Sequence, residues 1–267
     1  MNKSVVSFFS PVAGIGTTST VLSIAMSLEK HTDSRIGVLM LNALDEGSDY
    51  VEKSIAHLDE LKPLLAGEGL NQSEDFLSKF TRIGKQLFIL HGNRNRCIER
   101  HYHPKEIEYL IDLAEKEFDI VLIDSGSHFD NALSAVSLTH ENKIVFVVNQ
   151  QPKAVRRYHQ LAEQILRPLN IDLDNINYLI NGYQDKTYIL PVKQIAQEMN
   201  VKQYSLLPYY DKAILAEIEN KILYEVADQK YRDAVDSVAE GLCKDLGLGW
   251  TQTEKKKGLA KLFSSRG

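Results

Sequence analysis

Two glycines, one residue apart, follow the first apolar run of the chain. The segment reads Ser10-Pro11-Val12-Ala13-Gly14-Ile15-Gly16-Thr17-Thr18-Ser19, and a stretch with helical periodicity comes next. Gly14 and Gly16 permit positive φ angles and a close approach of the backbone to a ligand. N–H groups in such a loop, together with a helix N-terminus, cradle phosphate oxygens, and the hydroxyl groups that follow can ligate magnesium. By themselves, the two glycines fit a tight strand-to-helix turn equally well.

Short apolar runs alternate with longer amphipathic stretches along the chain. Several runs are continuous in Val, Ile, Leu and Phe, which indicates strands buried on both faces, as in a parallel sheet covered by helices. The expected strands are Val5–Phe9, Ile36–Leu41, Gln86–Leu90, Ile120–Ile123, Ile144–Val148, Tyr178–Ile180 and Tyr204–Leu207. The expected helices include Thr18–Lys30, Pro104–Glu117, Val155–Leu166, Pro191–Met199 and Tyr231–Leu246. The alternation predicts an α/β fold, a doubly wound and mostly parallel sheet of about seven strands flanked by helices.

The composition is that of a soluble globular protein. Of 267 residues, 43% are apolar and 25% charged, which suits one large domain with a sizeable core. The two cysteines, Cys97 and Cys243, lie far apart, which indicates a reducing compartment rather than a disulfide scaffold. A net charge of −5 argues against a body that coats nucleic acid. No apolar run approaches the roughly 20 residues of a bilayer span, and no signal-peptide pattern opens the chain, so we expect a cytoplasmic protein.

The glycine loop resembles the phosphate-binding loop of the MinD/ParA (SIMIBI) P-loop ATPases, which reads Lys-Gly-Gly-x-Gly-Lys-Thr-Thr. The matching positions are Gly14, Ile15, Gly16, Thr18 and Ser19. Val12 stands at the family's signature lysine, which reaches the partner's nucleotide, and Ala13 replaces a glycine. Thr17 replaces the lysine that holds the β- and γ-phosphates. The resemblance therefore implies a degenerate Walker A motif that lacks both lysines.

Later segments resemble the same family in the same order, over roughly residues 4–245. Phe118–Gly126 resembles the Walker B strand, which implies that Asp124 and Thr18 lie at the magnesium; a helix cap is the alternative role for Asp124. In the segment 37–46, which resembles the first switch, Asn42 and Leu44 replace two aspartates. Asp45 is shifted by one position, and we assign it no catalytic role.

Two segments near the end of the resemblance concern the nucleotide base. Tyr178–Tyr183 resembles the strand whose asparagine reads adenine, which implies this role for Asn181; the alternative is a turn cap with Gly182. The segment 206–211 resembles the Ile-Pro-Tyr-Asp segment beside the base, and a helix over Ala213–Val226 is expected after it. The resemblance thus implies ATP or ADP with Mg²⁺, bound by the residues Gly14, Ile15, Gly16, Thr17, Thr18, Ser19, Asn181 and Pro208.

Loss of the lysines bears directly on catalysis. Phosphoryl transfer depends on positioned positive charge, and the removal of two cations costs several kcal/mol of transition-state stabilisation. The lost aspartates lie on a different strand, so the site is damaged twice. We therefore expect a pseudo-ATPase with weak or absent hydrolysis, and we assign no catalytic residue. The alternative is an active ATPase that uses another cation, such as Arg94, Arg96 or an arginine of a partner.

The end of the chain is basic and amphipathic. We divide the chain into a P-loop domain (1–248), a linker (249–257) and a tail (258–267). A helix there places Leu259, Leu262 and Phe263 on one face, a pattern that is typical of interfacial helices on anionic lipid and resembles the membrane-targeting sequence of MinD. Cations surround these residues, namely Lys255, Lys256, Lys257 and Lys261. The alternative is a disordered, solubilising tail.

The sequence predicts a localisation factor, most similar to the TadZ/CpaE and MinD branch. Such a protein would form a homodimer, lie peripherally at the inner face of the plasma membrane, and recruit a protein of a pilus, secretion or division apparatus. A ParA-like partition protein is a further alternative. It has weak support, because Arg156 and Arg157 are two basic residues on an acidic body, so we do not expect DNA as a partner.

Overall fold

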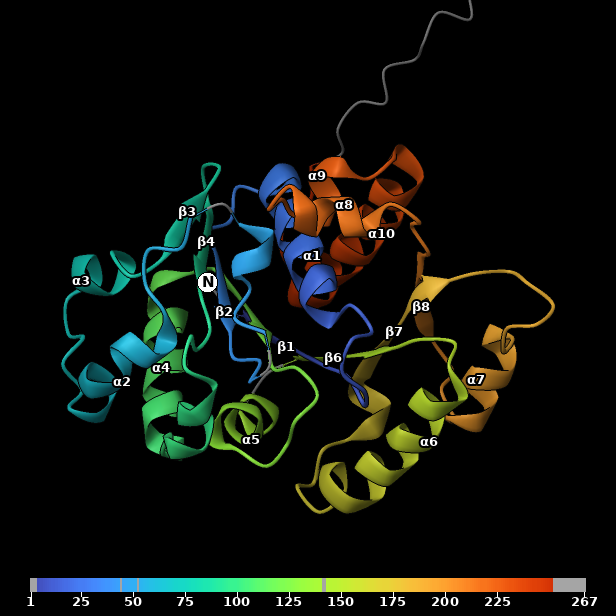
Figure 1. Ribbon diagram of the computed structural model, residues 1–267, viewed down its shortest axis with the longest axis horizontal. Coiled ribbons are helices and arrows are strands. Elements are labelled where there is room, and N and C mark those ends of the chain that lie inside the picture. The colour runs from blue at the N-terminus through green and yellow to red at the C-terminus, as the bar shows by residue number, and fades with distance from the viewer. Residues whose placement is uncertain (1–3, 44, 52, 141–142, 252–267) are drawn as a thin grey trace, which may run out of the picture.

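A computed structural model describes residues 4–43, 45–51, 53–140 and 143–251 (Figure 1). Its centre is one eight-stranded sheet in the order β3-β4-β2-β5-β1-β6-β7-β8. All neighbours are parallel except β3 and β4. The strands are β1 (Ser4–Phe9), β2 (Ile36–Met40), β3 (Thr81–Ile83), β4 (Leu87–Leu90), β5 (Ile120–Asp124), β6 (Lys143–Val148), β7 (Ile176–Tyr183) and β8 (Tyr204–Pro208).

Helices cover both faces of the sheet (Figure 1). They are α1 (Thr17–His31), α2 (Leu58–Ala66), α3 (Ser73–Leu77), α4 (Pro104–Glu117), α5 (Ala132–Thr139), α6 (Pro152–Leu161), α7 (Val192–Glu198), α8 (Ala213–Ile218), α9 (Leu223–Val226) and α10 (Gln229–Leu246). Short 3₁₀ turns lie at Ser48–Tyr50, Arg96–His101 and Leu173–Asn175, and a π turn, Ala162–Leu166, extends α6.

The alternation of strand side chains explains the continuous apolar runs. Val6 and Val38 pack on the face covered by α1 and α10, while their neighbours Val5 and Leu39 pack under α4. Both faces of the central strands are therefore buried, and most positions of these strands are apolar. The predicted α/β fold class, with its doubly wound and mostly parallel sheet, is confirmed.

Some predicted boundaries were wrong. The three-residue strand β3 was missed, because a short edge strand with Arg82 exposed carries no apolar run. The single helix expected over Ala213–Val226 is two helices, α8 and α9. Asn220 between them has a φ of 49°, a left-handed conformation that ends a helix. The polar segment before α4 contains a 3₁₀ turn, Arg96–His101.

The last described residues pack against α1. The Thr251 N–H donates to the His31 carbonyl at 2.8 Å, and His31 Nδ1 lies 2.9 Å from the Thr251 carbonyl. The Trp250 ring stacks on the His31 ring at 4.5 Å. The predicted linker therefore begins with residues held on the domain, and the predicted tail lies outside the described residues. Among described helices, none is long and apolar enough to cross a membrane.

Candidate functional site

The glycine loop joins β1 to α1 at the carboxyl edge of the sheet. Gly14 and Gly16 have φ angles of 75° and 85°, in the left-handed region that favours glycine. Gly16 caps α1, and its carbonyl accepts from the Thr20 N–H at 3.0 Å and the Thr20 hydroxyl at 2.7 Å. The first turn of a helix leaves N–H groups without intrahelical acceptors, so this end of α1 is an electropositive cradle.

A buried carboxylate lies beside this cradle. Asp124 ends β5, is 0% exposed, and accepts from the Thr18 hydroxyl at 2.6 Å and the Gly126 N–H at 3.1 Å. Asn42, which follows β2, points its amide nitrogen at the Thr18 hydroxyl at 3.4 Å. The pairing of β2 with β5 brings Met40 opposite Asp124, which explains why two segments far apart in sequence meet here.

Burial raises the pKa of Asp124 from 3.8 to about 6, against the lowering effect of the Thr18 hydroxyl. The ionised form is costly because nothing charged compensates it within the described residues of the site. A divalent cation next to Thr18 and Asp124 would supply that compensation. The hydroxyl–carboxylate pair therefore has the chemistry of a magnesium site.

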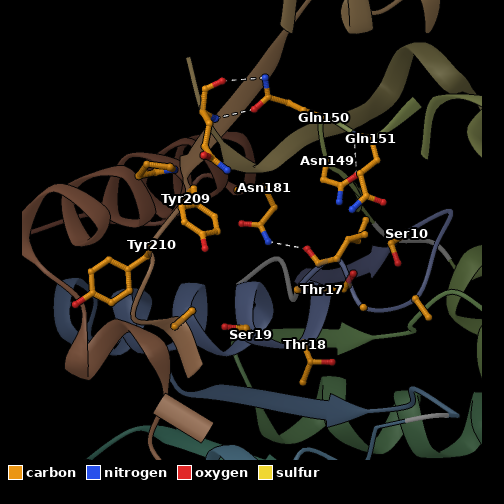
Figure 2. Close-up of a pocket in the computed structure, with 18 of the residues that line it drawn as sticks. Ser10, Thr17, Thr18, Ser19, Asn149, Gln150, Gln151, Asn181, Tyr209 and Tyr210 are labelled. Atoms are coloured by element: carbon orange, nitrogen blue, oxygen red, sulfur yellow. Dashed lines mark hydrogen bonds between the residues drawn. The ribbon is translucent and has the colours of Figure 1, made fainter. Parts of the chain in front are cut away.

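Asn181 of β7 holds the loop in place. Its amide nitrogen donates to the Ile15 carbonyl at 2.7 Å (Figure 2). A Cβ on Gly16 would lie 2.5 Å from the same nitrogen, so only glycine leaves room for this contact. The proposed reading of adenine by Asn181 stays a prediction, and the structure adds a second task, the positioning of the loop.

Gln150, at the end of β6, clamps the opposite wall of the site. Its amide nitrogen donates to the Gln184 carbonyl at 3.1 Å, and its oxygen accepts from the Gln184 N–H at 2.7 Å (Figure 2). The amide nitrogen also donates to the Leu190 carbonyl at 2.9 Å. One side chain thus fixes both ends of the segment 184–190. This residue was missed from the sequence, although its place at the carboxyl end of a strand was a usable signal.

These elements enclose a cavity of about 1100 Å³. Every residue predicted to hold nucleotide lines this cavity, namely Gly14, Ile15, Gly16, Thr17, Thr18, Ser19, Asn181 and Pro208. Asp124 lies behind Thr18, to which it is hydrogen-bonded. Tyr209 and Tyr210, from the segment expected beside the base, also line the cavity, and so do residues that were not predicted, namely Tyr50, Gln150, Tyr188 and Glu217. Among the described residues of the lining there is no lysine, arginine or histidine, whereas Asp45 and Glu217 are both present.

A second cleft, of about 360 Å³, adjoins the loop at Val12 and Ala13. It is lined by the cations Lys153 and Arg157 of α6 and by His128. Positive charge is therefore available beside the loop, although not within the large cavity. Arg94, considered above as a substitute cation, instead lies 3.8 Å from Glu60, and neither it nor Arg96 lines the cavity.

Comparison with known proteins gives similar structures but no similar sequences. The sequence matches no protein-family model, and no curated protein is significantly similar to it. Among solved structures, a ParA family ATPase from Chlorobium tepidum superposes with a TM-score of 0.76 at 17% identity, over 90% of this chain and 98% of that one. MinD complexed with Mg-ADP from Pyrococcus horikoshii gives 0.72 at 16%, over 92% and 98%. The apo form of McdA from Cyanothece gives 0.69 at 12%, over 90% and 100%.

The chain has the MinD/ParA fold. Within this fold, the residues present fit part of a magnesium nucleotide. The two positive-φ glycines, the N-terminus of α1 and the Thr18–Asp124 pair form a phosphate and metal cradle. Thr17, which the sequence places at the family's phosphate-binding lysine, is a buried neutral side chain and offers no charge to a phosphate.

Proposed function

We propose that the chain is a MinD/TadZ-like localisation factor. It forms a dimer, binds ATP or ADP with Mg²⁺, and hydrolyses ATP weakly or not at all. Its basic tail attaches it to the inner face of the plasma membrane, where it positions a pilus, secretion or division apparatus. The observation that carries the proposal is a cavity that keeps the backbone cradle and the Thr18–Asp124 pair yet has no cation in its described lining.

In such a cavity, nucleotide binding and phosphoryl transfer have different electrostatic requirements. Backbone N–H groups at the start of α1 stabilise phosphate oxygens in the ground state, and Thr18 and Asp124 would hold the magnesium that neutralises them. Charge that develops during phosphoryl transfer needs further positioned cations. Asp45 and Glu217 act in the opposite direction, since they repel an anion. Binding is therefore expected to need Mg²⁺, and turnover is expected to be very slow.

Binding and turnover test this proposal directly. Titration calorimetry should show ATP and ADP binding only with Mg²⁺, and Asp124→Ala should abolish it, while the exposed control Asp245→Ala leaves it unchanged. Steady-state phosphate release, with and without anionic vesicles, should stay at background. Brisk hydrolysis that Asp124→Ala abolishes would contradict the pseudo-ATPase assignment.

A second candidate function is an active ATPase, and the cationic cleft favours it. Lys153 and Arg157 lie beside Val12, the position of the missing signature lysine, so a second copy of the chain could present them to the phosphates. The same turnover assay decides this point. Hydrolysis that is lost in Lys153→Gln or Arg157→Gln, but kept in the exposed α4 control Lys105→Gln, would establish this candidate.

A further inference from the structure

Helix α8 exposes three large apolar side chains. Ile214, Leu215 and Ile218 are 56%, 40% and 68% exposed, whereas Ala216 is buried against the core. Ile214 and Ile218 are one turn apart and share a face. We name these three residues the α8 patch. A contiguous apolar surface on a short helix is typical of a docking site.

The stretch of chain that carries the α8 patch is acidic. Residues 209–228 include only two basic residues, Lys212 and Lys221. The same stretch holds five acidic residues, namely Asp211, Glu217, Glu219, Glu225 and Asp228. Lys221 is already paired with Glu219 at 2.8 Å. An occupant of the patch should therefore be apolar on one side and cationic around it.

The chain itself contains a segment with this chemistry. Residues 252–267 hold five cations and one acid, and their apolar residues are Leu259, Ala260, Leu262 and Phe263. Since the whole chain carries −5, this segment contributes +4 and residues 1–251 carry −9. The segment and the body thus attract each other.

The start of this segment is linked to α8 through α1 and α9. Thr251 is bound to His31 at the end of α1, and the neighbouring Lys30 donates to the Tyr224 hydroxyl of α9 at 3.1 Å. Helix α9 packs on both α1 and α8, and Figure 1 shows α8 and α9 side by side. Leu259 is eight residues beyond Thr251, a reach of up to about 28 Å in extended chain. The four-residue helix α9 contacts both α1, which ends at the anchor residue His31, and α8, which carries the patch.

We propose that, without lipid, the segment 255–263 docks on the α8 patch. Its leucines and phenylalanine cover Ile214 and Ile218, and its lysines face the surrounding acids. A membrane competes for the same apolar side chains, so docking holds the tail away from lipid. Ala213 and Glu217 of α8 also line the large cavity, which links the docking site to the ligand site. This regulatory consequence rests on the proposed lipid binding, but the contact itself does not.

Hydrogen exchange in lipid-free buffer tests the contact. Amides of residues 213–219 should exchange about tenfold more slowly in the full chain than in a chain ending at Thr251, as for a contact formed about 90% of the time. Ending at Thr251 keeps the His31 anchor intact. Ile214→Ser/Ile218→Ser should give the fast rates in the remaining amides of full-length protein. Ile55→Ser, at a site that is 61% exposed, is the matched control and should leave them slow.

The protection should not depend on protein concentration, and a peptide of residues 252–267 should restore it to the shortened chain. Equal exchange of the full and shortened chains would overturn the proposal. Protection that grows with concentration and survives the truncation would assign the patch to a second copy of the chain and would also overturn it.

Vesicle binding then separates this inference from the proposed function. Ile214→Ser/Ile218→Ser should bind phosphatidylglycerol vesicles about tenfold more tightly than wild type, because the tail is released. If the isolated peptide and all variants ignore vesicles while the exchange pattern holds, the membrane function fails and the docking stands. If wild type and the double variant bind vesicles equally, the competition is absent and the proposed regulation is overturned.

Discussion

At the scale of single residues, the buried carboxylate of Asp124 makes the stability of the fold depend on pH. Its folded-state pKa is raised from 3.8 to about 6 by burial, so between these values the folded chain binds more protons than the unfolded chain. The stability contributed by its protonation is therefore lost as pH rises through about 6. Asp124→Asn should remove this slope and stabilise the metal-free protein by about 3 kcal/mol at pH 7.5.

Urea unfolding at several pH values, without Mg²⁺, measures this effect. Wild type and Asp124→Asn should converge below pH of about 4, where the carboxyl is protonated in both states. Added Mg²⁺ and nucleotide should stabilise wild type and not the variant. Parallel pH profiles for the two proteins would show that the carboxylate is not desolvated as described.

Gly16 and Gly14 form a matched pair for a second prediction. Both have positive φ, but a Cβ on Gly16 meets the Asn181 amide at 2.5 Å, and a Cβ on Gly14 meets nothing within 4 Å. Gly14→Ala should cost about 1 kcal/mol from backbone strain alone. Gly16→Ala should cost about 2–3 kcal/mol, because the hydrogen bond from Asn181 to Ile15 is also lost. Equal unfolding free energies for the two variants would contradict the positioning role of Asn181.

Site residues could be predicted from the sequence where the residues that define them lie close together along the chain. Gly14, Gly16 and Thr18 lie within one short segment, and Asp124 ends an apolar strand, so residue type and order were enough to find them. Gln150 was missed, because its task depends on two carbonyls 34 and 40 positions away, at 184 and 190. Tertiary hydrogen bonds of this kind leave no pattern in a single sequence.

At the scale of elements, the hydrogen bonds of Gln150 hold the segment 184–190, which forms one wall of the cavity. Gln150→Leu removes three hydrogen bonds from the segment 184–190, each with a net contribution of about 1 kcal/mol. The amides of this segment should exchange faster, and nucleotide affinity should fall about tenfold while magnesium dependence is kept. Gln203→Leu, at an exposed position outside the cavity lining, is the control. Unchanged exchange in Gln150→Leu would show that the segment is held by other contacts.

Periodicity found most of the elements and failed where tertiary context decides. All seven expected strands exist, because strands buried on both faces are mostly apolar and stand out as apolar runs. The edge strand β3 has only three residues, and its register comes from β4. The break between α8 and α9 depends on the φ of Asn220, which an amphipathic pattern does not report.

At the scale of the whole molecule, charge separates the body from the tail. Residues 1–251 carry −9 and are repelled by an anionic bilayer, so the proposed membrane binding would rest on the +4 segment after them. Each basic residue near such a surface contributes about 1 kcal/mol. Replacing Lys255, Lys256 and Lys257 with glutamine should therefore weaken binding to phosphatidylglycerol vesicles about 100-fold.

The matched control replaces three exposed lysines of the body, Lys105, Lys116 and Lys193. It lowers the net charge by the same amount, so it should bind vesicles slightly less than wild type through repulsion alone. Binding should also fall with salt and rise more steeply than protein concentration, since the proposed dimer would present two tails and gain avidity. Equal losses in the two triple variants would mean that net charge, and not the tail, governs attachment. A linear concentration dependence would mean that single chains bind, and the dimer would then have no part in marking the membrane.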